Sequence, residues 1–186
     1  VSGIIEFEDR EKKDSATSIK KLKQRGIHCV MLTGDRSEIA ETFGESFGIT
    51  EVHAEVLPGE KAGIISRYQD RGEIVAMVGD GINDAPALTQ ADVGIALGTG
   101  TDIAMESGDI VLVKGDLGGV VRTAILAEAT FKKIKQNLFW AFIYNVIAIP
   151  LAFLGLLHPV IAEGAMALSS INVVWNSNRL RKTYLS

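Results

Sequence analysis

The apolar stretch from Leu138 to Leu157 contains no Asp, Glu, Lys or Arg and lies within the longest uncharged run of this chain, residues 136–162. An α-helix rises about 1.5 Å per residue, so a segment of this length matches a hydrocarbon core about 30 Å thick. Residues 138–157 are therefore predicted to form a transmembrane helix, with the lipid bilayer as its surroundings.

A second apolar stretch follows over residues 159–178, with Glu163 as its one acid, and only the turn around His158 separates the two. The pair is predicted to form a helical hairpin. Basic residues flank it on both outer sides, at Lys132, Lys133, Lys135, Arg179, Arg181 and Lys182. Because basic flanks favour the cytoplasmic side, both ends of the hairpin and the tail 179–186 are expected there. The alternative is a buried core hairpin of a soluble protein.

The remainder of the chain has a different pattern, in which short apolar runs alternate with amphipathic segments of about twelve residues. Residues 117–137 are predicted as a connecting helix. Strands are predicted at 3–7, 27–32, 52–54, 74–78, 93–97 and 110–113, and helices at 15–25, 36–47 and 60–71. This alternation favours parallel strands joined by right-handed crossovers, so residues 1–116 are predicted to form an α/β domain with a doubly wound parallel sheet.

The overall charge argues against nucleic acid as a partner. The formal net charge is -4 and the pI is about 5.4, so no basic surface for nucleic acid is expected. Cys29 is the one cysteine and cannot form a disulfide within the chain. The chain begins at Val1 without a cationic, apolar leader, so we expect no signal peptide and interpret it as part of a longer protein.

Polar residues follow two of the predicted strands directly. Thr33, Gly34 and Asp35 come after the strand 27–32, at the start of a helix whose free N–H groups would attract a phosphate. Asp80, Asn83 and Asp84 come after the strand 74–78, and such hard oxygen donors suit Mg²⁺. In a doubly wound sheet these loops share the carboxyl edge, where ligands bind.

Lys61 lies between these two loops in the sequence, near the start of a predicted helix, and could neutralise the same phosphate. Each piece has an ordinary alternative: Thr-Gly-Asp is a common helix cap, Gly-Asp-Gly a common turn, and a lone Lys is usually solvated. Their order along the chain, each at an expected strand end, favours one shared site of hydroxyl, cation and carboxylates.

Three segments, Met31–Asp35, Pro58–Lys61 and Met77–Leu88, resemble the phosphorylation domain of P-type ATPases, which has a haloacid-dehalogenase-like fold. The resemblance extends to Asp9, Lys12 and Ala16, and to Ala91–Ala96, Gly100–Asp102 and Ala104. It implies that residues 1–116 are the C-terminal part of that domain, without its first strand and phosphorylated Asp.

The resemblance implies a role for each site residue in a reaction whose substrate is ATP. Asp80, with Asp84, would bind Mg²⁺, while Thr33 and Lys61 would contact the transferred phosphoryl group. Gly34, Asp35 and Asn83, together with Asp84 in a second role, would shape and orient the site. Because the Asp-Lys-Thr-Gly-Thr motif of the family does not occur in these residues, we expect this chain alone to be inactive. The remainder of the pump, with its actuator domain, nucleotide-binding domain and earlier membrane helices, is the implied partner.

The hairpin resembles the last two helices of copper-exporting members of the family, through Tyr144-Asn145 and Met166-x-x-Ser169-Ser170. A thioether is a soft donor suited to Cu(I), so these five residues are predicted to contribute to the site of the transported ion. Routine helix packing is the alternative for them, and a silver pump would carry the same residues. The resemblance implies a plasma (inner) membrane protein, with a copper chaperone as a candidate partner.

Two other functions remain open on the sequence. One is a membrane-tethered phosphatase of the same fold, which would need its own nucleophilic Asp at a strand end. The other is a non-catalytic split subunit that pairs with the missing half of a pump.

Overall fold

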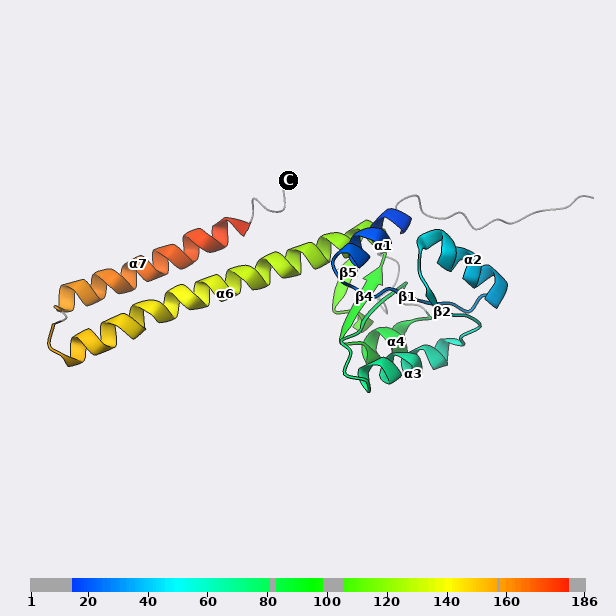
Figure 1. Ribbon diagram of the computed structural model, residues 1–186, viewed down its shortest axis with the longest axis horizontal. Coiled ribbons are helices and arrows are strands. Elements are labelled where there is room, and N and C mark those ends of the chain that lie inside the picture. Colours follow the sequence, from blue (N-terminus) through cyan, green and yellow to red (C-terminus); the bar gives the residue numbers. More distant parts are fainter. Residues whose placement is uncertain (1–14, 81–82, 99–105, 157, 181–186) are drawn as a thin grey trace, which may run out of the picture. The chain divides into compact units, whose positions relative to one another are not determined.

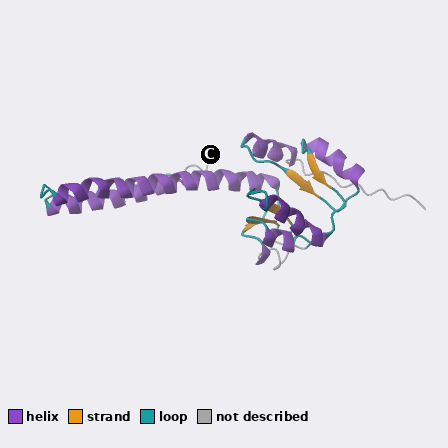
Figure 2. Ribbon diagram, turned by 60° about the horizontal axis from the view of Figure 1, so that its bottom comes forward, coloured by secondary structure: helices purple, strands orange, loops and turns teal. Residues whose placement is uncertain are grey.

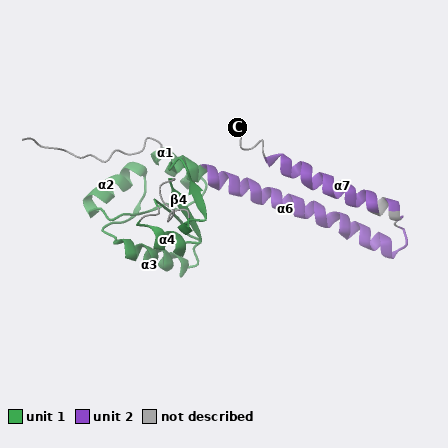
Figure 3. Ribbon diagram, turned by 180° about the vertical axis from the view of Figure 1, so that it is seen from behind, with its two compact units in different colours: residues 1–121 green, residues 122–186 purple. Residues whose placement is uncertain are grey.

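The computed structural model describes residues 15–80, 83–98, 106–156 and 158–180. The chain divides into two compact units, residues 1–121 and 122–186, which Figure 3 shows in different colours. The predicted strand at 3–7 lies outside the described residues, as do Asp9, Lys12, Gly100–Asp102 and Ala104, which carry part of the family resemblance.

The first unit alternates helices and strands as predicted, and it contains one further helix, residues 85–90, that the sequence pattern did not predict (Figure 1). Its elements are α1 (Ser15–Gln24), β1 (Val30–Leu32), α2 (Ser37–Phe47), β2 (Glu51–His53), α3 (Pro58–Gln69), β3 (Ala76–Gly79), α4 (Ala85–Gln90), β4 (Val93–Leu97) and β5 (Ile110–Leu112). All described strand pairs are parallel, which confirms the predicted α/β fold.

The described strands form two ladders, one of β1 and β2 and the other in the order β3, β4, β5 (Figure 2). Met31 pairs with Val52 in the first ladder, and Val78 pairs with Ile95 in the second. Helix α2 connects β1 to β2, α3 connects the two ladders, and α4 connects β3 to β4. The connections through α2 and α4 are therefore crossovers between parallel strands.

Helix ends in the first unit follow from particular residues. Helix α2 ends at Gly48, whose φ of 67° is the left-handed conformation that favours glycine. Pro58 occupies the first turn of α3, where its missing N–H costs nothing, and Glu60 accepts a hydrogen bond from the Leu57 amide (3.1 Å). Residues 58 and 59 thus extend α3 two residues before the predicted start.

The core of the first unit lies where α3 and α4 pack against the three-stranded ladder. It comprises Ile65, Met77, Ala87, Leu88 and Ala96, with Leu32 of β1 packed against it. At Gly94 of β4 a Cβ atom would lie 2.7 Å from the Leu88 carbonyl oxygen, so α4 approaches β4 more closely than a side chain would allow. This core joins Leu32, the last residue of β1, to Met77 within β3.

The second unit is a helical hairpin of α6 (Leu117–Phe153) and α7 (Pro159–Asn178). Helix α6 runs without a break through the predicted connecting helix and most of the predicted first span, and it includes Pro150. Among the described residues, α6 is the one helix that is long and apolar enough to cross a membrane. Its apolar side chains are largely exposed, as expected for a surface in contact with lipid; membrane crossing by α7 stays a prediction.

Leu88 gives a test of this core. Its side chain is 1% exposed, so Leu88→Ala should leave a cavity and lower the free energy of unfolding by about 3 kcal/mol. Ile74, 87% exposed, is the control, and Ile74→Ala should change stability by less than about 0.5 kcal/mol. Pulse proteolysis of the full chain in detergent across a urea series measures both, and equal effects would contradict the described core.

Candidate functional site

Two hydrogen bonds within the loop after β1 join Thr33 to Asp35. The Thr33 hydroxyl donates to Asp35 Oδ2 (2.7 Å), and the Asp35 amide donates to Thr33 Oγ1 (3.1 Å). Thr33 is half-buried, whereas Gly34 and Asp35 are exposed. The predicted hydroxyl therefore lies at the carboxyl end of β1, with its orientation held by Asp35.

Backbone hydrogen bonds join this loop to the segment that starts α3. The Thr33 amide donates to the His53 carbonyl (3.0 Å), and the Val56 amide donates to the Thr33 carbonyl (3.0 Å). Val56 lies two residues before Pro58, the first residue of α3, and Lys61 belongs to the first turns of that helix. Thr33 and the helix that carries Lys61 are thus fixed to each other.

Lys61 meets the loop after β3. Its Nζ atom lies 2.7 Å from Asp84 Oδ1, and the two side chains are only 14% and 13% exposed. A Cβ atom at Gly79 would lie 2.5 Å from Asp84 Oδ2, so a glycine is required for the Asp84 carboxylate to pack against the end of β3. The structure therefore brings together two of the predicted site residues, from α3 and from the loop before α4.

Asp80 and Asn83 complete the group from the loop after β3. Both are exposed, and Asp80 directly follows the last residue of that strand. No cluster of three His, Cys, Asp or Glu side chains able to hold a metal occurs in the part of the chain that the structure describes. Mg²⁺ usually needs only one or two protein carboxylates beside phosphate and water oxygens, so Asp80 and Asp84 fit this ion by donor type.

Glu55 is a site neighbour that the sequence analysis missed. Its φ of 56° is unusual for a residue with a side chain, and its amide donates to the Asp35 carbonyl (2.9 Å). Its carboxylate accepts from the Ser37 hydroxyl (3.2 Å) and from the Ser37 amide (3.3 Å), at the start of α2. A protein carboxylate thus occupies part of the helix start at which a phosphate was predicted. No sequence motif signals this contact, because Glu55 lies eighteen residues from Ser37.

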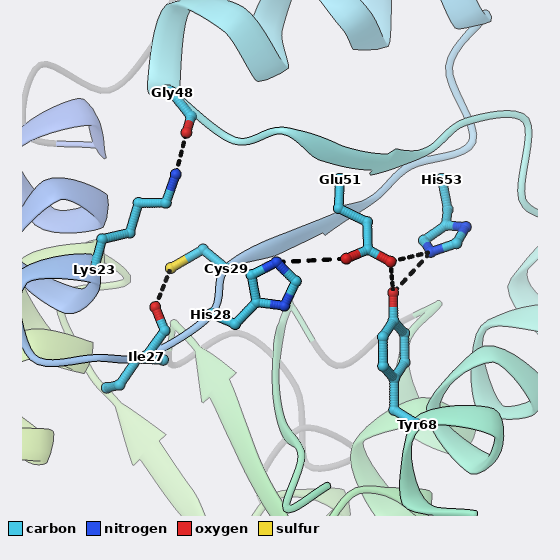
Figure 4. Close-up of polar contacts among 8 residues, drawn as sticks. All are labelled: Lys23, Ile27, His28, Cys29, Gly48, Glu51, His53 and Tyr68. Atoms are coloured by element: carbon cyan, nitrogen blue, oxygen red, sulfur yellow. Dashed lines mark hydrogen bonds and ion pairs between the residues drawn. The ribbon is translucent and has the colours of Figure 1, made fainter. Parts of the chain in front are cut away.

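A second polar cluster lies around Glu51 of β2, where Tyr68 of α3 reaches that strand (Figure 4). The Tyr68 hydroxyl donates to Glu51 Oε1 (2.5 Å), and His53 Nε2 lies 3.0 Å from that hydroxyl oxygen. His28 Nε2 lies 3.4 Å from the other carboxylate oxygen of Glu51. Burial, and then the Glu51 carboxylate, raise the pKa of Tyr68 to about 12. This cluster fastens α3 to β2, and its His53 is joined to Thr33 of the predicted phosphate site through the backbone.

In the hairpin, the predicted ion-site residues differ in their surroundings. Tyr144 and Ser169 are half-buried, whereas Asn145, Met166 and Ser170 are exposed. Asn145 donates to the Ala141 carbonyl (2.9 Å) and Ser170 donates to the Met166 carbonyl (3.2 Å), both within their own helices. Across the hairpin the Tyr144 hydroxyl accepts a hydrogen bond from Asn172 (3.3 Å), a residue that the sequence analysis did not name.

Known proteins resemble both units. Residues 1–92 match the family described as haloacid dehalogenase-like hydrolase. The chain is 54% identical over 185 residues to the "Copper-exporting P-type ATPase" of Staphylococcus epidermidis, covering 100% of this chain and 23% of that protein. It is 53% identical over 186 residues to the "Probable copper-importing P-type ATPase A" of Enterococcus hirae, covering 98% of this chain and 26% of that protein.

A solved structure extends the likeness to three dimensions. The crystal structure of a zinc-transporting PIB-type ATPase in the E2.Pi state matches 92% of this chain, and 28% of its own, with a TM-score of 0.86 and 37% identity. The chain belongs to the P-type ATPases. The recognition of the heavy-metal branch from the sequence is thereby confirmed, and the chain spans about a quarter of the length of the curated relatives.

For this P-type ATPase chain, Gly79 tests the geometry around Asp84. Gly79→Ala should push the Asp84 carboxylate away from the end of β3 and lower the free energy of unfolding by about 1–3 kcal/mol. Gly63 in α3 has no atom within 4 Å of its Cβ position, so Gly63→Ala should be neutral or stabilising by up to about 1 kcal/mol. Denaturant unfolding of both variants in detergent measures the difference, and a neutral Gly79→Ala would refute the close contact.

Tyr68 predicts how stability depends on pH. The folded chain holds the phenol proton up to a pKa of about 12, against an ordinary value of 10.0. The contribution of this group is therefore complete below pH 10 and is lost as pH rises towards 12. Unfolding curves over this range should show the ATPase chain losing stability relative to its Tyr68→Phe variant. A constant difference between the two proteins would contradict the raised pKa.

Proposed function

We propose that this chain is part of an ATP-driven pump that exports Cu(I), and that it contributes the Mg²⁺-binding and phosphate-binding part of the phosphorylation site. The observation that carries the proposal is the 54% identity to a copper-exporting P-type ATPase along the whole chain. The buried contact of Lys61 with Asp84 supports the same conclusion, since it joins two residues of the phosphorylation motifs (2.7 Å).

At the phosphorylation site, catalysis requires positioned charge more than covalent groups of this chain. Asp80 and Asp84 would hold Mg²⁺, which neutralises phosphate oxygens when bound. Lys61 supplies a cation on the first turns of α3, and the hydrogen bond to Asp84 fixes where that cation lies. Thr33 offers a hydroxyl that can donate to a phosphoryl oxygen once it leaves Asp35 Oδ2. Gly34, Asp35 and Asn83 would shape and orient the site.

The nucleophile must come from a segment outside these residues, because the Asp-Lys-Thr-Gly-Thr motif does not occur in them. The remaining parts of such a pump, its nucleotide-binding and actuator domains and its earlier membrane helices, are therefore the proposed partners. A copper chaperone is a further proposed partner, as the source of the ion.

In the membrane, the hairpin would contribute Tyr144, Asn145, Met166, Ser169 and Ser170 to the transported-ion site. The exposed Met166 thioether supports Cu(I), because a soft sulfur donor suits this ion better than Zn²⁺ or a hard cation. Exposure of Met166 and Asn145 on the hairpin fits a site that other membrane helices complete. With basic residues at both outer flanks, the phosphorylation domain and the C-terminus would lie in the cytoplasm of a plasma-membrane protein.

The similar proteins differ in ion and direction: one relative is named as an exporter, another as an importer, and the matched structure is that of a zinc-transporting ATPase. The soft thioether favours copper. The relative with 54% identity is named as an exporter, which supports the proposed direction.

The proposed function is tested with the full-length pump in proteoliposomes. Met166→Ala should raise the Cu(I) concentration for half-maximal ATP hydrolysis about tenfold, since loss of one soft ligand costs on the order of 1.4 kcal/mol. Phosphorylation by inorganic phosphate should be unchanged in this variant. Lys61→Ala should show the reverse, with phosphorylation lost and Cu(I) binding retained.

Leu168→Ala is the matched control in the hairpin, because this residue is exposed on the same helix and carries no ligand atom. Copper-independent hydrolysis of ordinary phosphate esters would favour the membrane-tethered phosphatase. Unchanged copper dependence in Met166→Ala would remove this residue from the ion site.

A further inference from the structure

The two helices of the hairpin are joined by polar side chains along one edge. At the end near residue 133, Asn176 of α7 donates to Asn137 Oδ1 (2.8 Å) and accepts from Lys133 Nζ (2.8 Å). Asn137 also donates to the Ser177 hydroxyl (2.8 Å). These contacts fix the register of α7 against α6 through groups that hydrocarbon cannot satisfy.

A single polar contact lies further along the hairpin. Asn172 Nδ2 donates to the Tyr144 hydroxyl oxygen (3.3 Å), and both side chains are half-buried. Among the described residues, this is the one hydrogen bond of the Asn172 side chain. Asn172 lies four residues before Asn176, so both residues are on the same face of α7, which is the face towards α6.

Tyr144 is also the one residue of the proposed ion site whose side chain forms a hydrogen bond across the hairpin in the described part of the chain. By accepting from Asn172, the phenol oxygen has one lone pair engaged, which leaves the second lone pair and the O–H group for other partners. Ser169, another residue of the proposed site, lies three residues before Asn172 and therefore on the same side of α7.

We propose that Asn172 is a positioning residue of the transported-ion site and acts by orienting the Tyr144 hydroxyl. This inference rests on the proposed function, because it assumes that Tyr144 faces the ion. The Asn176 contacts already hold the two helices in register, so Asn172 is not needed to keep the hairpin closed. Its role is to select one orientation of the phenol group.

The experiment measures ATP hydrolysis by the full-length pump in proteoliposomes as a function of Cu(I). Asn172→Leu keeps the branched arrangement of the side-chain heavy atoms and removes the donor, and Asn172→Ala provides a second variant if the bulkier leucine disturbs the helix contact. Interhelical hydrogen bonds in membranes contribute about 0.6 kcal/mol on average and up to about 1.7 kcal/mol, so each variant should raise the half-maximal Cu(I) concentration about 3- to 18-fold. The maximal rate should stay close to that of the wild type.

A double-mutant cycle with Tyr144→Phe separates positioning from packing. If Asn172 acts through Tyr144, the double variant should be no worse than the weaker-binding single variant. Asn172→Gln retains an amide donor and should restore part of the affinity. Val174→Ala, at an exposed position two residues further along α7, is the control and should leave the Cu(I) dependence unchanged.

Multiplicative effects of Asn172→Leu and Tyr144→Phe, or wild-type Cu(I) dependence in both Asn172 variants, would overturn the inference. A parallel loss of phosphorylation by inorganic phosphate would indicate a folding role and also overturn it. If the wild-type pump responds to Zn²⁺ and not to Cu(I), the proposed function fails on the ion. The same cycle measured with Zn²⁺ then decides the role of Asn172 separately.

Discussion

The ion pair between Lys61 and Asp84 determines how the site in the first unit is arranged. Each side chain is largely buried, at 14% and 13% exposed, so both charges have lost much of their hydration. Such a pair adds little net stability, because desolvation offsets the attraction, but removing one partner leaves an uncompensated charge. The pair therefore acts mainly as a geometric constraint that ties the first turns of α3 to the loop between β3 and α4.

Other contacts extend this constraint to the rest of the site. Gly79 leaves the space in which the Asp84 carboxylate lies, and the Val56 amide joins the start of α3 to the Thr33 carbonyl. Leu32, one residue before Thr33, packs against the core that contains Met77, two residues before Gly79. Groups separated by about fifty residues in sequence are thus held without any long-range covalent link. In the proposed function, phosphoryl transfer would benefit from this arrangement because charges placed in advance need no reorganisation during the reaction.

The two helices of the hairpin are held together in a different way. Their surfaces are apolar, and in lipid apolar contact between helices adds little stability. Amide groups on α7 provide the specific contacts, through Asn176 near one end and Asn172 further along. A zinc-transporting P-type ATPase has nearly the same fold at 37% identity. The likeness to a zinc transporter shows that this fold does not by itself identify the ion, and in the proposed function the Met166 thioether is the soft donor that favours copper.

The sequence by itself determined the class of fold, the limits of most helices, the apolar character of α6 and the motifs of the P-type ATPases. These features depend on local periodicity and on short residue patterns, which are visible along the chain. Only the tertiary structure decided that Lys61 bonds to Asp84, that Glu55 occupies part of the start of α2, and that Asn172 faces Tyr144. Each of these contacts joins residues from different elements, and their partners depend on packing and side-chain orientation, which no local pattern specifies.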